Sequence, residues 1–284
     1  MTEASLPTPL VSIVTPSYNQ AQFLEETLRS VANQDYPRIE HIVMDGGSTD
    51  GSVDLLAAWS NQHPILWRSG PDNGQAAAIQ AGVAMATGEI VAWLNSDDVY
   101  LGPSAITEIV EAMRGGAAIV TGAGWYLFED GSKERPIPVF PDRIDFKTLR
   151  LVDWVLQPAT FVRRDLFLSC PIDTGLQFAF DWDLFIKLSQ KATFTPLARE
   201  IAGYRRHQTG KTVAGGPQRQ RELLEVVRRY NGRLSWPYLL LAPVVLGHRV
   251  AGHLPKRLAA FGELLLNRFA ALTQKVTDGR GIPY

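Results

Sequence analysis

The sequence contains a single cysteine, Cys170, among 284 residues. One cysteine excludes an internal disulfide framework and agrees with a reducing compartment. No stretch approaches the roughly 20 apolar residues that a membrane-spanning helix needs. The segment 1–9 lacks the basic region and apolar core of a secretory signal peptide, so we expect a cytoplasmic protein.

Two nucleotide-binding motifs are also missing. Dinucleotide-binding folds carry Gly-x-Gly-x-x-Gly after their first strand, but the first predicted strand here, 10–15, is followed by a segment without glycine, 16–20. The P-loop pattern Gly-x-x-x-x-Gly-Lys-Ser/Thr does not occur either. These absences argue against a Rossmann dehydrogenase and a P-loop NTPase. No motif for RNA or DNA binding is present, so no nucleic-acid partner is predicted.

The composition is globular, with 45% hydrophobic and 20% charged residues. The net charge of -1 conceals an asymmetry between the two ends of the chain. Residues 1–204 hold 14 Lys and Arg against 25 Asp and Glu, a net of -11, whereas residues 205–284 hold 14 against 4, a net of +10. An acidic body and a basic tail predict two surfaces with different partners.

Strand and helix patterns alternate over the first hundred residues. Predicted strands at 10–15, 39–44, 65–68 and 90–94 are separated by three helical patterns. This alternation predicts βαβ units on a mostly parallel sheet. Because parallel strands end at one edge, where ligands bind, the polar loops that follow the four strands should converge. For any one loop, ordinary turn chemistry is the alternative.

The run Ile90–Leu94 is apolar throughout and predicts a strand buried on both faces of the sheet. Polar residues follow it directly, and they include the adjacent pair Asp97 and Asp98. Two neighbouring carboxylates repel each other. A Mg²⁺ or Mn²⁺ ion would reconcile them, with phosphate oxygens completing its shell. The alternative is that the pair caps a helix or shapes a turn.

Four segments together resemble the family-2 glycosyltransferases, which have the GT-A fold: residues 11–19, 44–50, 72–75 and 86–98. Weaker matches continue to about residue 213. The resemblance implies an α/β domain over residues 1–215, with a mostly parallel, Rossmann-like sheet flanked by helices. It also implies an inverting enzyme that moves a sugar from a nucleoside-diphosphate sugar to an acceptor hydroxyl in polysaccharide or glycolipid synthesis.

The resemblance further implies a donor site that uses the converging loops. Asn95 stands where the family's Asp-x-Asp motif usually begins with Asp, so a metal would depend mostly on Asp97. Asp45 would hydrogen-bond the base. The implied nucleotide-sugar-binding residues are Thr15, Pro16, Tyr18, Asp45, Asp72, Gly74, Asn95, Ser96 and Asp97, and the implied metal ligands are Asp97, Asp98 and His207.

The segment 180–184 resembles the family's Glu-Asp-x-Asp-Leu motif, which makes Asp181 the implied catalytic base. Phe180 replaces the usual Glu. An Asp at a helix start is otherwise a common N-cap, and the two roles are compatible. Asp183 is expected to be structural.

Other parts of the resemblance concern the sugars and the diphosphate. Gln157 and Trp182 would face the sugar or the acceptor, although Gln157 could equally lie in a β-strand with a polar kink. Arg206 or Lys211 would neutralise the leaving diphosphate. His207 could alternatively be a solvated surface residue.

Residues 216–284 are predicted as a basic amphipathic helical tail. Apolar positions recur with helical spacing over 218–230 and again over 258–276, with basic residues beside them. Such helices can lie on an anionic membrane, which would place the enzyme peripherally at the inner face of the plasma membrane, near a lipid-linked acceptor. Packing on the body or forming a homodimer are the alternatives.

Two further function classes are open. A sugar-phosphate nucleotidylyltransferase shares the sheet architecture, but it would need a glycine-rich basic loop after the first strand. No such loop is present in this sequence. A catalytically inactive module that binds nucleotide sugars is suggested by Asn95 and Phe180. The sequence does not identify the base, the sugar or the acceptor.

Overall fold

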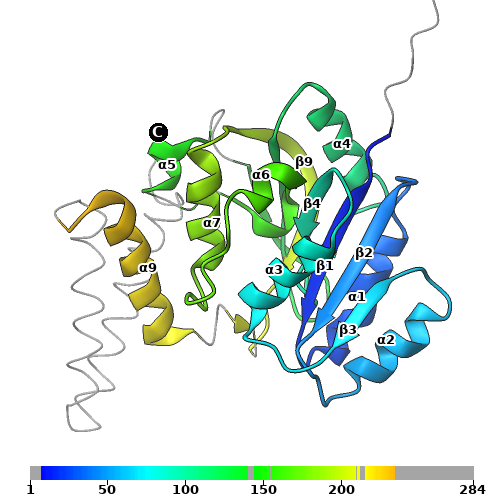
Figure 1. The fold of residues 1–284 in the computed structure, drawn as a ribbon. Helices are drawn as coiled ribbons and strands as arrows, with labels where there is room; N and C mark the ends of the chain where they lie inside the picture. The colour runs from blue at the N-terminus through cyan, green and yellow to red at the C-terminus, as the bar shows by residue number, and fades with distance from the viewer. Residues whose placement is uncertain are drawn as a thin grey trace, which may run out of the picture.

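The computed structural model describes residues 8–139, 144–151, 153, 155–208, 210–211 and 215–233. They form an α/β fold around one sheet, with helices on both faces (Figure 1). The strands are β1 Val11–Ser17, β2 Ile39–Asp45, β3 Leu66–Ser69, β4 Ile90–Trp93, β5 Val99–Tyr100, β6 Ile119–Leu127, β7 Lys133–Ile137, β8 Thr160–Arg163 and β9 Phe194–Arg205. The helices are α1 Ala21–Ala32, α2 Ser52–Ser60, α3 Gln75–Met85, α4 Ala105–Arg114, α5 Phe146–Leu149, η1 Gln157–Ala159, α6 Arg164–Leu168, α7 Phe180–Ser189 and α9 Gly216–Asn231.

The sheet has the order β3-β2-β1-β4-β8-β6-β9-β5, and β7 pairs with β6. β1 is parallel to both β2 and β4, and β3 is parallel to β2. The predicted βαβ units of the first hundred residues are therefore confirmed. Beyond β4 the sheet is mixed, because β8 is antiparallel to β4 and β6, while β6 and β9 are parallel.

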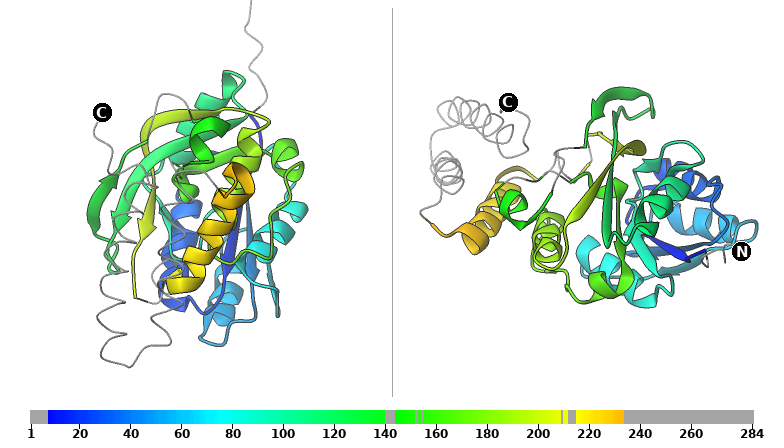
Figure 2. Two further views of the ribbon diagram at one scale, coloured as in Figure 1. Left: turned by 90° about the vertical axis from the view of Figure 1, so that its left-hand side faces the viewer. Right: turned by 90° about the horizontal axis from the view of Figure 1, so that it is seen from above.

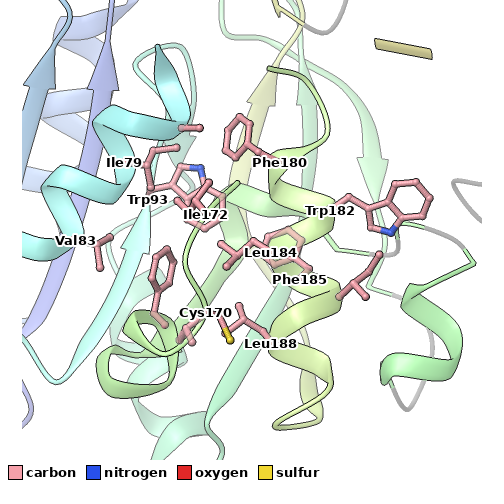
Figure 3. Close-up of a cluster of buried hydrophobic side chains, with 14 of the residues drawn as sticks. Ile79, Val83, Trp93, Cys170, Ile172, Phe180, Trp182, Leu184, Phe185 and Leu188 are labelled. Atoms are coloured by element: carbon pink, nitrogen blue, oxygen red, sulfur yellow. The ribbon is translucent and has the colours of Figure 1, made fainter. Parts of the chain in front are cut away.

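β4 lies in the middle of this order and is buried on both faces, as its apolar run predicts. Successive side chains of a strand point to opposite faces. Ile90 and Ala92 join the cluster that α4 covers, whereas Val91 and Trp93 join the cluster formed with α3, α6 and α7. Figure 3 shows part of this second cluster, including Trp93 and Cys170. The polar residues that follow β4 are therefore carried on a rigid, central strand.

Helix α9 lies beside α5 and α7 (Figures 1 and 2). Val226 and Val227 are fully buried in the same cluster as α7. The side chains of Arg229 and Tyr230 both bind Asp183, at 2.7 and 2.9 Å. The first helix of the predicted tail, α9, therefore packs on the body, which is one of the alternatives for the tail.

The rest of the predicted tail, 234–284, lies outside the described residues. Within the described part of the chain, no helix combines the length and the apolar character needed to cross a bilayer.

Candidate active site

A cleft of about 660 Å³ opens beyond the carboxyl end of β4. Its walls come from the start of α3, the β6–β7 hairpin, the segment before α7, the chain after β9, and α9. Half of the sequence-predicted site residues line it: Asn95, Asp97, Gln157, Asp181, Trp182, Arg206, His207 and Lys211. The other half lie outside this cleft, at the carboxyl ends of β1 and β2 or in the loops after β1, β3 and β4.

The loops after the first three strands do converge at this edge of the sheet. A Cβ added to Gly46 would lie 3.1 Å from Oδ2 of Asp72 and 3.3 Å from Cδ2 of Tyr18. Tyr18 is 63% exposed, whereas Pro16 is buried within β1. Oδ1 of Asp72 accepts the N–H of Gly74 at 2.7 Å. The exposed ring of Tyr18 and the carboxylate of Asp72 thus lie close together at the carboxyl edge of the sheet.

Two other predicted donor residues have buried side chains. Thr15 is fully buried, and its Oγ1 lies 2.9 Å from Nε2 of His41. Asp45 is also buried, and its Oδ2 accepts the backbone N–H of Ser48 at 2.9 Å and the hydroxyl of Ser69 at 2.7 Å. The Asp45 carboxylate therefore holds the loop after β2 in shape, and the Thr15 side chain faces the interior.

Asp97 and His207 meet in the cleft. Nε2 of His207 lies 3.0 Å from Oδ2 of Asp97. The imidazole packs against the ring of Phe23, with centroids 4.6 Å apart, and only 1% of its side chain is exposed. Ser96, the residue before Asp97, is buried. His207 is consequently not a solvated surface residue, and it is held where a cleft-bound group would meet it.

The Asp97–His207 pair fits a divalent cation that shares its coordination with a substrate. A carboxylate oxygen and an imidazole nitrogen both ligate such ions. Across the residues that the structure describes, no group of three His, Cys, Asp or Glu side chains could hold an ion. Phosphate oxygens and water would complete the shell, as is usual for Mg²⁺.

A chain of hydrogen-bonded amides crosses the floor of the cleft. Nζ of Lys211 donates to Oε1 of Gln75 at 2.9 Å, and Nε2 of Gln75 donates to Oδ1 of Asn95 at 2.7 Å. Nδ2 of Asn95 donates to Oε1 of Gln157 at 3.0 Å. Nε2 of Gln157 ends the chain on the Trp93 carbonyl at 2.7 Å. Gln157 begins the short helix η1, so its expected alternative, a kinked strand, is wrong.

Asp181 lies in the first turn of α7, two positions after the N-cap. The N-cap is Ala179, so Asp181 does not take the capping position that is the alternative to a catalytic role. Its Oδ1 accepts the N–H of Trp182 at 2.8 Å. Desolvation in the cleft raises the pKa of Asp181, and the nearby cations Arg219 and Lys211 offset part of that rise. A carboxylate with a raised pKa binds a proton more readily, which suits a general base.

The family model for glycosyl transferase family 2 matches residues 12–185, more than half of the chain. The chain belongs to glycosyltransferase family 2. The resemblance seen in the sequence and the GT-A fold class are thereby confirmed.

Comparisons with individual proteins and solved structures agree with this family and fold. The chain is 42% identical over 110 residues to the uncharacterized glycosyltransferase Rv1514c of Mycobacterium tuberculosis, covering 38% of this chain and 41% of that protein. It is 28% identical over 194 residues to chondroitin synthase of Pasteurella multocida, covering 66% and 20%. The match therefore spans less than half the length of either relative. The mannosyltransferase PcManGT from Pyrobaculum calidifontis, solved with GDP-Man and Mn²⁺, has the same fold, with a TM-score of 0.62, 18% identity and coverage of 96% and 84%.

The fold explains why this family-2 chain has Asn at position 95. Nδ2 of Asn95 donates to Oδ2 of Asp98 at 3.0 Å, and Oδ1 of Asp98 accepts the backbone N–H of Arg205 at 3.0 Å. Burial and the charge of Asp97 raise the pKa of Asp98. An Asp at position 95 would lack the N–H and face a second carboxylate. Both Asp98 oxygens point into the protein, so the geometry does not support its predicted role as a metal ligand.

Two other predicted family-2 contacts differ from expectation. The indole of Trp182 is 2% exposed and donates to the Leu149 carbonyl at 2.7 Å, on the opposite side of α7 from Trp93 (Figure 3). It anchors α7 to α5, so Trp182 borders the cleft with almost none of its surface exposed to a sugar. Arg206 is paired with Glu134 at 3.1 Å, whereas Lys211 lies close enough to Asp181 for its charge to lower the pKa of that carboxyl.

Sequence reasoning missed three residues of this family-2 site. Gln75 lies within a recognised segment, yet nothing in the pattern showed that it links Asn95 to Lys211. Arg219 lines the cleft from α9, and Glu222 binds the segment before α7. No signal marks these two, because a charged residue on an amphipathic helix usually predicts a solvated face.

Proposed function

We propose that the chain is an inverting glycosyltransferase that uses a nucleoside-diphosphate sugar and Mg²⁺ or Mn²⁺, with Asp181 as the general base. One observation carries the proposal: Asp181 and the Asp97–His207 pair line the same cleft. The cleft thus combines a base for the acceptor hydroxyl with side chains that could ligate a cation bound to the donor diphosphate.

The donor would lie along the edge of the sheet. Tyr18 and Asp72 would contact the nucleoside, and Asp97 and His207 would hold a cation against the diphosphate. Lys211 adds a positive charge to the cleft near Asp181. When bound, the cation would neutralise charge that develops on the departing nucleoside diphosphate. The GDP-Man and Mn²⁺ present in the mannosyltransferase structure support this assignment.

The reaction itself would be a single displacement. Asp181 takes the proton of an acceptor hydroxyl, and the acceptor oxygen forms a bond to the anomeric carbon. The bond between that carbon and the phosphate oxygen breaks at the same time, and its electron pair leaves with the nucleoside diphosphate. Attack opposite the leaving group inverts the anomeric configuration.

The acceptor would be a saccharide or a lipid-linked saccharide. The name of the relative chondroitin synthase supports polysaccharide synthesis. Attachment to an anionic membrane remains a proposal that depends on residues 234–284 and their positive charge.

Release of nucleoside diphosphate from UDP-, GDP- and dTDP-sugars tests the proposal, with simple saccharides as acceptors. We expect release from one donor class with a metal present. Binding of a nucleotide sugar without any turnover would indicate an inactive binding module. Formation of a nucleotide sugar from nucleoside triphosphate and sugar phosphate would indicate a nucleotidylyltransferase.

A further inference from the structure

Glu222 of helix α9 binds the segment that leads into α7. Its Oε2 accepts three consecutive backbone N–H groups, those of Gln177, Phe178 and Ala179, at 2.8, 2.6 and 3.2 Å. One carboxylate oxygen therefore binds the backbone donors of the three residues that precede the helix carrying Asp181. The N-cap residue of this helix, Ala179, makes no capping hydrogen bond with its own side chain.

This segment lies between the donor end of the cleft and the base. A Cβ added to Gly74, at the start of α3, would lie 3.3 Å from Oε1 of Gln177. At the other end, the rings of Phe178 and Phe180 flank Nζ of Lys211, with centroids 5.7 and 5.4 Å away. A shift of the segment would consequently move Gln177, the surroundings of Lys211 and the first turn of α7 together.

Helix α9 is itself held against α7. Asp183 has a fully buried side chain and binds Arg229 and Tyr230, and Arg229 also pairs with Asp173 at 2.9 Å. Glu222 thus projects from a helix that is fixed to both ends of the segment 173–183. Such a rigid support can hold a reactive side chain within a few tenths of an ångström.

We propose that Glu222 is a positioning residue for the base Asp181, so that α9, which lies beyond the matched family segment, is a required part of the active site. This inference rests on the proposed function. Glu222 acts by holding the segment 177–179, and it does not touch the reacting atoms.

Glu222→Ala tests the inference against a matched control on the same helix. Glu225→Ala removes an exposed carboxylate that pairs with Arg228 at 2.7 Å. We expect Glu222→Ala to lower kcat at least about tenfold, part of the usual 10²- to 10⁴-fold contribution of a general base, with the donor KM within about twofold of wild type. Glu225→Ala should match wild type. Glu222→Gln keeps an acceptor oxygen and should recover most of the lost kcat.

The pH profile separates positioning from a general loss of stability. A loosened segment lets water reach Asp181, and its raised pKa would then fall toward the ordinary value. The acidic limb of kcat should therefore move to lower pH in Glu222→Ala and stay in place in Glu225→Ala.

Amide hydrogen exchange over 173–183 adds a readout that needs no activity. We expect faster exchange of the amides of 177–179 in Glu222→Ala and a smaller increase in Glu222→Gln, with α7 and α9 still protected. Unchanged exchange and kcat in both variants, together with an impaired Asp181→Asn, would overturn the role of Glu222 and leave the proposed function intact. A wild-type chain without any transferase activity would overturn the proposed function instead, and faster exchange would then support only the structural contact. If Glu222→Ala does not fold, exchange in Glu222→Gln decides the question: a neutral acceptor should still give a measurable increase over 177–179, and an unchanged exchange rate would overturn the role of Glu222.

Discussion

Asp181 is the side chain on which the proposed chemistry depends. Asp181→Asn keeps the size of the residue but cannot accept a proton. Since general-base catalysis contributes roughly 10²- to 10⁴-fold, we expect kcat to fall at least about 10²-fold while donor affinity stays near that of wild type. Initial rates of nucleoside diphosphate release and donor titrations measure the two effects.

The product of the wild-type enzyme provides a second check. NMR should show an anomeric configuration inverted with respect to the donor. Retained configuration, or near-normal turnover by Asp181→Asn, would contradict Asp181 as the base. Because burial raises its pKa, the acidic limb of the wild-type kcat profile should lie above the usual Asp value of about 3.9.

Asn95→Asp should impair the enzyme, although it restores the commoner family motif. The new carboxylate would face Asp98, whose pKa is already raised, and the pair would be driven to share a proton. When an acid has a higher pKa in the folded state than in the unfolded state, the protein loses stability as pH rises through the folded-state pKa. The variant should therefore be less stable than wild type at pH 8, with a smaller deficit near pH 5.

Urea unfolding of Asn95→Asp at the two pH values measures this difference. Asn19→Asp is a suitable control, because Asn19 lies on an exposed loop outside the cleft. An equal deficit at both pH values would contradict the repulsion between positions 95 and 98.

Asp97→Ala should weaken nucleoside diphosphate binding when Mg²⁺ or Mn²⁺ is present and should abolish turnover. The reason is that Asp97 supplies the carboxylate of the Asp97–His207 pair and is its more exposed member. Calorimetric titration with and without metal measures the effect on binding, and circular dichroism checks the fold. Full wild-type activity in excess EDTA would show that no dissociable metal takes part.

The contact between α7 and α9 should be important for stability. Asp183 is fully buried and pairs with Lys187 at 2.7 Å and Arg229 at 2.7 Å. Removing one partner of a buried ion pair costs about 3 to 5 kcal/mol. Asp183→Ala should accordingly lower the free energy of unfolding by about 3 kcal/mol, as measured by urea denaturation.

The exposed pair Glu25–Arg29 offers a comparison within α1. Glu25→Ala should cost less than about 1 kcal/mol, since exposed ion pairs contribute little. Similar losses in Asp183→Ala and Glu25→Ala would show that α9 is only weakly coupled to the body.

For the molecule as a whole, the basic C-terminal region is expected to direct membrane attachment. A chain that ends after Arg233 keeps α9 and the cleft but loses residues 234–284. Each Lys or Arg near an anionic surface contributes about 1 kcal/mol, screened by salt. The shortened chain should lose binding to phosphatidylserine vesicles in a sedimentation assay at low salt, while it keeps turnover with a soluble acceptor. If the full-length protein does not bind such vesicles, the result would favour a role of the C-terminal region in packing or dimer formation.

Much of the fold could be predicted from local patterns. The apolar run Ile90–Leu94 is confirmed as a strand buried on both faces, and the alternation of strands and helices is confirmed as a parallel half-sheet. Side-chain periodicity and turn residues act over a few positions, so they are readable without a structure. The family follows from short motifs for the same reason.

The precise use of each side chain depends on contacts between distant segments. Asn95 meets Asp98 and Gln157, and Glu222 meets a segment about 45 residues earlier in the chain. The burial of Trp182 and the inward direction of Asp98 likewise follow from packing against other elements. Hydrogen bonds of this kind are specified by position in space, and no pattern within one segment of the sequence reveals them.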